Sequence, residues 1–252
     1  MKYQVNAQML NALFTDLTFY TRNGKNLVKR KSRVSPDRLK FSPEYAALRH
    51  HQQYLKLAAS GGKLLRTAFA PLLKGVTDAN CVGRLTGHLV KVIKSDTINI
   101  PEQKRIDLGN LDLMRGFEFN ANCPLSQVLK APFQVSMGAA KSQLNLELPA
   151  LVTIKQMRAP RGSSHFSFVM GIAAIDFTSG TYQTNFAKTG PIPMVSNFSR
   201  TINLSCELDE PAHHLMFVVL GIQFSQQVRK DYKVIHEPEF DALRLVAVKR
   251  IV

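Results

Sequence analysis

The sequence has no tryptophan, three cysteines and few acidic residues, 18 against 33 lysines and arginines. Cys81, Cys123 and Cys206 are odd in number, far apart and without CxxC spacing, so we expect buried, reduced thiols and neither a disulfide framework nor a zinc site. The absence of tryptophan also counts against a carbohydrate-binding protein, because the chain lacks that residue for stacking on a sugar ring.

No stretch is long and apolar enough for a membrane-spanning helix. The longest apolar run, Leu215–Ile222, is far below the ~20 residues that such a helix needs. Residues 1–8 contain no continuous apolar segment of a secretory signal. We therefore expect no membrane partner, and a protein that is cytoplasmic or packed into a particle assembled in the cytoplasm.

The recognisable catalytic and cofactor motifs are missing too. Gly62-Lys63 lacks the rest of a phosphate-binding P-loop, and Gly162-Ser163-Ser164-His165 lacks the second glycine of a nucleophile elbow, so we interpret it as a turn entering a strand. His213-His214 and His236-Glu237-Pro238-Glu239 contain metal-ligating residue types, but the proline excludes a helix that presents them on one face. The sequence predicts a protein that is not an enzyme and binds no cofactor or metal.

What the sequence has in excess is positive charge, and it is concentrated near the N-terminus. Residues 1–75 hold 14 Lys and Arg and 3 Asp and Glu, a net +11 out of +15 for the whole chain. Such an uneven distribution of positive charge indicates what kind of partner the protein binds, but it does not indicate the fold. It favours a polyanion or an acidic protein surface as the partner.

A β-hairpin is predicted within this basic region. Asn23-Gly24 lies between Leu17–Tyr20 and Asn26–Val28, and this dipeptide is typical of a two-residue turn that needs positive φ at both positions. Two antiparallel strands should therefore flank it. The predicted polyanion- or partner-binding residues lie on these strands and after them: Arg22, Lys25, Lys29, Arg30, Lys31, Arg33, Arg38, Lys40, Arg49 and Lys56.

Two interpretations of this basic arm remain open. In the first, the basic segment is an assembly arm, which docks on an acidic patch of a neighbouring copy or adds its free strand edge to another sheet. Alternatively, it binds nucleic acid without sequence preference, with basic residues on phosphates and Phe19, Tyr20 and Tyr45 available for stacking on bases. No zinc-finger, RNP or basic-zipper pattern is present. We favour the first, a structural protein that forms homo-oligomers.

Helices are expected between the hairpin and residue 100. Ser35-Pro36 and Ser42-Pro43 are helix-start signals, and a helix from Glu44 to Ala59 should end at Gly61-Gly62. A second helix should begin near Lys63. A third is predicted from the 3,4,3 spacing of its apolar residues, which are Val82, Leu85, Leu89 and Val92.

The rest of the chain has the pattern of a β-protein, with short strands separated by Gly/Pro turns. Leu215–Leu220 is continuously apolar, so we expect a central strand covered on both faces. The predicted class is α+β: residues 1–100 form a hairpin and three helices, and residues 101–252 form an antiparallel β-sandwich. The predicted strands are Gly116–Asn120, Phe133–Met137, Leu144–Leu148, Leu151–Met157, His165–Phe177, Tyr182–Phe186, Thr201–Leu208, His214–Phe224, Tyr232–Ile235 and Leu243–Val248.

Two stretches resemble an uncharacterised family of bacterial proteins common in the Bacteroidota. They are Phe19 through Lys31, followed by Pro43 and Arg49, and Gly62 through Phe69, followed by Lys91-Val92-Ile93 and Gly116–Asn120. The resemblance covers the first half of the chain well and the second half loosely. It implies a bacterial source, such as a mobile element or particle, and no catalytic residue.

Overall fold

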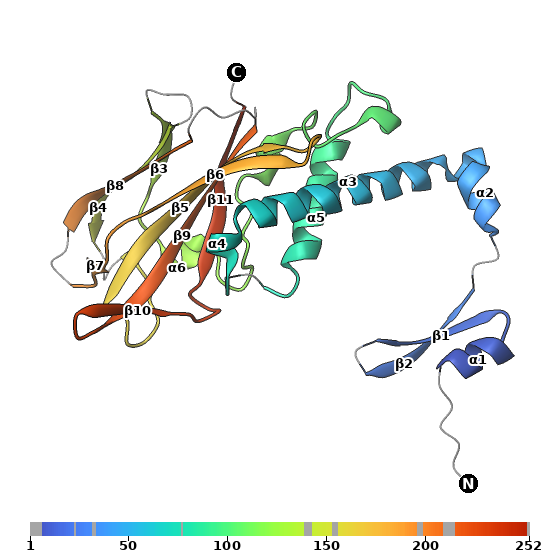
Figure 1. Ribbon diagram of the computed structural model, residues 1–252, viewed down its shortest axis with the longest axis horizontal. Coiled ribbons are helices and arrows are strands. Elements are labelled where there is room, and N and C mark those ends of the chain that lie inside the picture. The colour runs from blue at the N-terminus through green and yellow to red at the C-terminus, as the bar shows by residue number, and fades with distance from the viewer. Residues whose placement is uncertain are drawn as a thin grey trace, which may run out of the picture. The chain divides into compact units, whose positions relative to one another are not determined.

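A computed structural model contains both helices and antiparallel sheets, as expected for the α+β class (Figure 1). It divides into two compact units, Met1–His51 and Gln52–Val252. This division differs from the boundary near residue 100 that was expected from the sequence. The structure describes residues 7–22, 24–31, 34–76, 78–138, 143–152, 156–195, 199–208 and 215–250.

The first unit contains a short helix, the predicted hairpin and the predicted helix starts. Ser35 caps α2, since its hydroxyl oxygen accepts a hydrogen bond from the Arg38 N–H (3.3 Å), and Pro36 occupies the first turn. Pro43 begins η1, which leads directly into α3. The elements are α1 (Ala7–Leu13), β1 (Leu17–Arg22), β2 (Lys25–Arg30), α2 (Pro36–Phe41), η1 (Pro43–Tyr45) and the first turns of α3 (Ala46–Ala68).

The prediction that Gly61-Gly62 ends a helix, with a new one from Lys63, is wrong. α3 continues through both glycines to Ala68. A side chain at Gly61 would place its Cβ 2.4 Å from Ile106 Cδ1, so glycine here permits close packing. The other helices of the second unit are α4 (Ala70–Leu73), α5 (Cys81–Lys94), η2 (Pro101–Gln103), η3 (Leu111–Met114) and α6 (Leu125–Val128).

The second unit contains two antiparallel sheets. One is six-stranded, with the order β10-β9-β5-β6, β11 also pairing with β9 and β7 with β5; the other has the order β3-β4-β8. The first comprises β5 (His165–Asp176), β6 (Thr181–Lys188), β7 (Ile192–Pro193), β9 (Leu215–Val228), β10 (Asp231–Ile235) and β11 (Ala242–Arg250). The second comprises β3 (Gln134–Met137), β4 (Gln143–Val152) and β8 (Ser199–Glu207).

Two predicted strands differ from what the structure contains. Gly116–Asn120 forms no strand and only an isolated bridge between Glu118 and Arg244. Its end is held instead by the Asn120 side-chain amide, which donates to the carbonyl oxygens of Pro238 (2.7 Å) and Asp241 (3.0 Å). The strand predicted at Leu151–Met157 begins within β4, which includes Leu151 and Val152, and Met157 forms only an isolated bridge to Leu129; residues 153–155 lie outside the described part of the chain.

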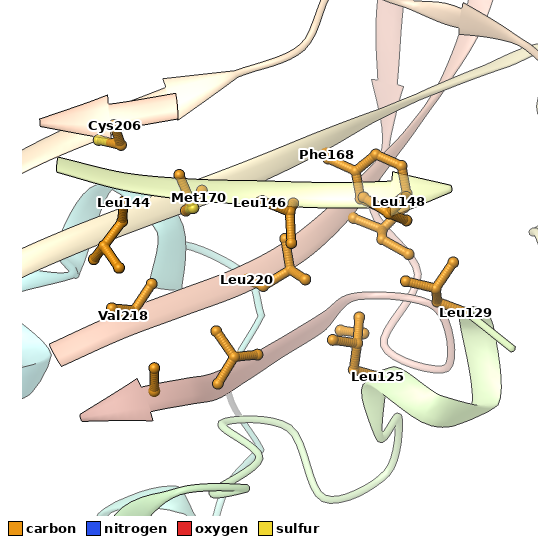
Figure 2. Close-up of a cluster of buried hydrophobic side chains, with 14 of the residues drawn as sticks. Leu125, Leu129, Leu144, Leu146, Leu148, Phe168, Met170, Cys206, Val218 and Leu220 are labelled. Carbon is orange, nitrogen blue, oxygen red and sulfur yellow. The ribbon is translucent and has the colours of Figure 1, made fainter. Parts of the chain in front are cut away.

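The side chains of β5 and β9 alternate between two hydrophobic clusters. On one face of the sheet, Met170 and Leu220 pack with Leu146 of β4, and α6 adds to the same cluster (Figure 2). On the other face, Phe217 and its neighbours pack with residues of α3 and α5, including Leu89. Successive strand side chains point to opposite faces, so a strand covered on both sides is apolar at every position. The predicted central strand at Leu215–Leu220 is confirmed.

All three cysteines are buried and free, as predicted. Burial in apolar surroundings raises the pKa of the Cys123 and Cys206 thiols to about 11. Both therefore stay protonated at neutral pH and pack as small apolar residues.

Candidate partner-binding hairpin

β1 and β2 form the hairpin that the Asn23-Gly24 turn predicts. The ladder begins at the pair Arg22 and Lys25 and runs to Leu17 and Arg30. Gly24 has a φ of +72°, the left-handed conformation that glycine adopts without steric cost. The turn chemistry in the sequence thus fixes the register of both strands.

The register sorts the basic residues onto the two faces of the hairpin. Arg22, Lys25 and Lys29 share one face, which we call the basic face, with Tyr20 between them. The Lys29 ammonium lies 5.8 Å from the centre of the Tyr20 ring, within the range of a cation–π contact. Arg30 belongs to the opposite face. The basic face combines three cations with the aromatic residue Tyr20, which is 38% exposed.

α1 packs against β1 and closes its outer edge. The Phe14 and Phe19 rings lie 5.6 Å apart. The Phe19 N–H donates to Asn11 Oδ1 (2.6 Å), and Asn11 Nδ2 donates to the Phe19 carbonyl (2.9 Å). A single side-chain amide therefore occupies the two backbone groups that a further strand would use at this position. Sequence reasoning missed Asn11, because nothing local relates it to Phe19.

The outer edge of β2 is open. Phe19 uses its backbone groups for Asn11, so its pair with Val28 is one of the pairs that are not hydrogen-bonded across the ladder. Hydrogen-bonded and non-hydrogen-bonded pairs alternate along an antiparallel ladder, so the pairs of Asn26 and Arg30 belong to the same class as that of Val28. The N–H and C=O groups of these three residues therefore point away from β1. Across the described residues, no strand pairs with β2 on that side. This edge can accept another strand.

The described residues of the first unit form no hydrophobic core of their own. None of the described residues of Met1–His51 is buried. Several large apolar side chains are strongly exposed, among them Leu13 (73%), Val28 (56%) and Phe41 (70%). A two-stranded hairpin is at best marginally stable in water without further packing. The unit therefore carries both charge and apolar surface that are available to a partner.

The remaining predicted binding residues have diverse surroundings. Arg38 forms an exposed ion pair with Glu44 (2.7 Å). Arg49 donates to the carbonyl oxygens of Leu39 (3.0 Å) and Ser42 (2.8 Å), so it holds the end of α2. The Lys31 N–H continues the ladder, Lys40 lies over the Phe41 ring, Lys56 is exposed on α3 in the second unit, and Arg33 lies outside the described residues.

A group of charged side chains in the second unit ties α5 to the segment after η3. Arg84 donates to the Asp78 carboxylate and to the Glu118 carbonyl (2.8 Å), and its guanidinium lies over the Phe117 ring. Glu118 lies 3.6 Å from the Arg244 guanidinium. Burial nevertheless raises the pKa of the Glu118 carboxyl to about 7. We interpret this group as a structural network that crosslinks the chain.

Motifs that contain catalytic or metal-binding residue types take part in turns and in hydrogen bonds within the fold. Gly162 has a φ of +82° and lies in a turn just before β5, as the sequence predicted. The Ser164 hydroxyl oxygen accepts from the Gln227 N–H (2.7 Å) and lies 2.9 Å from His165 Nδ1. His236 contacts Asp241 (3.6 Å), whereas His213-His214 lies outside the described residues. In the part of the chain that is described, no three His, Cys, Asp or Glu side chains are placed to hold a metal.

The chain matches no protein-family model, and no curated protein is significantly similar to it. None of the helices in the described ranges is long and apolar enough to cross a membrane.

Proposed function

We propose that this chain is a non-enzymatic structural protein that assembles into homo-oligomers through its hairpin. The observation that carries the proposal is the composition of the first unit, in which no described residue is buried while cationic and apolar side chains are exposed together. Burying an apolar side chain contributes about 1.5–3 kcal/mol. Docking on a second copy supplies the packing that the hairpin lacks.

A protein partner fits the exposed side chains of the first unit better than nucleic acid does. Leu13, Val28 and Phe41 are large apolar groups that a phosphate backbone cannot cover. The open edge of β2 is suited to strand addition, in which backbone hydrogen bonds supply affinity. Lysines on an edge strand oppose pairing with another basic strand. The receiving surface should therefore carry acidic side chains.

The second candidate function is sequence-nonspecific binding of nucleic acid or another polyanion. The basic face favours it, because Tyr20 lies between Arg22, Lys25 and Lys29 and is half exposed. Stacking on an aromatic ring combined with phosphate contacts is the usual means of binding single strands. In this case the binding constant should fall about a thousandfold between 50 and 200 mM salt if about six phosphates are contacted.

We propose further that the two sheets of the second unit form a β-sandwich. Its support is the hydrophobic cluster to which β4 and β8 contribute from one sheet and β5 and β9 from the other. A cytoplasmic or particle-bound location and membership of the Bacteroidota family are proposed on the sequence patterns alone.

Light scattering and gel shifts across a salt series distinguish the two functions. The test variant changes Lys29, Arg30, Lys31 and Arg33 to glutamine. A control with the same change in charge carries Lys91→Gln, Lys94→Gln, Lys130→Gln and Lys230→Gln, all on exposed positions of the second unit. Assembly through the hairpin predicts an oligomer whose mass falls in the hairpin variant and not in the control. A monomer that binds DNA or RNA with steep salt dependence would favour the second function, and a monomer that binds neither would refute both.

A further inference from the structure

The loop after α5 exposes two isoleucines in the second unit. Ile98 is 92% exposed and Ile100 is 57% exposed. Ile106, a few residues further on, is buried. Both exposed side chains belong to the loop Ser95–Lys104, which we call the isoleucine loop.

Hydrogen bonds hold this loop in one conformation. The buried Asp96 carboxylate accepts from the N–H groups of Ile98 (3.0 Å) and Asn99 (3.1 Å) and from the Asn99 side chain (2.9 Å). The Lys104 ammonium donates to the Asp96 carbonyl, and Gln53 of α3 donates to the Glu102 carbonyl (3.1 Å). A loop ordered in advance loses little entropy when it binds. The isoleucines are therefore presented to solvent by a rigid support.

A pocket of about 500 Å³ lies between α3, residues 105–107 and the turn from β5 to β6. Leu57, Leu64, Ile106 and Phe177 contribute apolar lining. This volume is within the range of small-molecule sites, so the pocket has room for an isoleucine side chain. The charged lining residues are Lys63, Arg105 and Asp107. Arg105 pairs with Asp107 (2.9 Å), so the charges of the lining sum to the single positive charge of Lys63.

The isoleucine loop and the pocket are neighbours on the surface of the second unit. Gln53 of α3 contacts the loop, and Leu57, one helical turn later, lines the pocket. Lys104 ends the loop and Arg105 begins the segment that lines the pocket. A projection and a cavity that lie side by side on one surface are suited to a two-fold contact, in which each copy inserts into the other.

We propose that a second copy of this chain occupies the pocket, with Ile98 of each copy inserted into the pocket of the other. The contact also brings the acidic Glu102 side of the loop towards Lys63. It does not involve the hairpin, so it is a second assembly surface beyond the one proposed above. An assembly with two different contacts can grow beyond a dimer.

The contact is tested by light scattering of the full chain in about 1 M salt, with Ile98→Asp and its control made in the hairpin glutamine variant. The variant disrupts association through the hairpin, and a Debye length of about 3 Å screens the charge-driven part that remains. Wild-type protein should remain a dimer. Ile98→Asp should weaken dimerisation at least about tenfold, since an isoleucine would no longer be buried. The control Val82→Asp, at a residue that is 52% exposed on α5, should have no effect. The hairpin glutamine variant should also dimerise normally, which separates failure of this proposal from failure of the first.

A mixing experiment identifies the two halves of the contact. Ser60→Trp places a large ring at the pocket and should abolish dimerisation. Ile98→Asp and Ser60→Trp should each be monomeric alone, but their mixture should form one-to-one complexes because one intact loop and one intact pocket remain. A wild-type monomer, unchanged dimerisation of Ile98→Asp, or a mixture that stays monomeric would overturn the proposal. Loss of dimerisation in Ser60→Trp but not in Ile98→Asp is the second of these outcomes, and it would mean that another part of the second copy occupies the pocket.

Discussion

Removing the Asn11 side chain should open the hairpin. Asn11→Ala eliminates both hydrogen bonds to Phe19, at 2.6 and 2.9 Å. Each contributes about 1 kcal/mol net, so about 2 kcal/mol is lost. At 1.4 kcal/mol per factor of ten, the ratio of ordered to open hairpin falls up to about 30-fold. Because the first unit has no buried residue among those described, no other packing compensates for the loss.

Trypsin cleavage measures this opening, since Arg22, Lys25 and Lys29 are cleavage sites within the two strands. When opening is fast relative to cleavage, the cleavage rate follows the open population. We expect Asn11→Ala to raise cleavage at these sites up to about 30-fold and to leave cleavage in the second unit unchanged. Thr21→Val is the matched control, because it removes only an exposed side-chain hydrogen bond to Asn26. Equal cleavage rates in wild type and Asn11→Ala would refute the role of Asn11 in ordering the hairpin.

Two further predictions concern the second unit. Gly109→Ala should destabilise it by more than about 1 kcal/mol in urea unfolding, because the new Cβ would lie 2.0 Å from the Val92 carbonyl oxygen. Gly83→Ala in α5 should instead stabilise it by up to about 1 kcal/mol, because the new Cβ would have no atom within 4 Å and alanine favours the helix. The free energy of unfolding should also fall by at most about 3 kcal/mol between pH 4.5 and 7, because folded Glu118, with its pKa raised to about 7, retains a proton that the unfolded chain releases. Unfolding of Glu118→Gln should lack this slope, and an unchanged slope would contradict the assignment.

Features determined by neighbouring residues could be predicted from the sequence. The Asn23-Gly24 turn and the Ser-Pro helix starts depend on local backbone chemistry, and the continuous apolar run at Leu215–Leu220 reports burial on both faces. The helix end at Gly61-Gly62 was wrong because glycine has two uses. Here it makes room for Ile106, which is distant in the sequence, and no local pattern distinguishes that from a helix end.

The sequence predicted which stretch of the chain carries the candidate binding residues, but not which of them lie together on one surface. Composition groups ten basic residues, whereas the register places Arg22, Lys25 and Lys29 together and Arg30 on the other face. Arg49 has the same charge but binds the end of α2. Charge is visible in a sequence, but the partner of a guanidinium depends on tertiary contacts.

Hydrogen exchange of the hairpin at two protein concentrations tests the proposed assembly most directly. If β2 and its neighbours dock on a second copy, the backbone amides of Lys25–Arg30 should exchange more slowly as the concentration rises. The glutamine variant of Lys29, Arg30, Lys31 and Arg33 should not show this protection. Exchange that is equally fast at all concentrations, in a protein whose mass is that of a monomer, would contradict assembly through the hairpin.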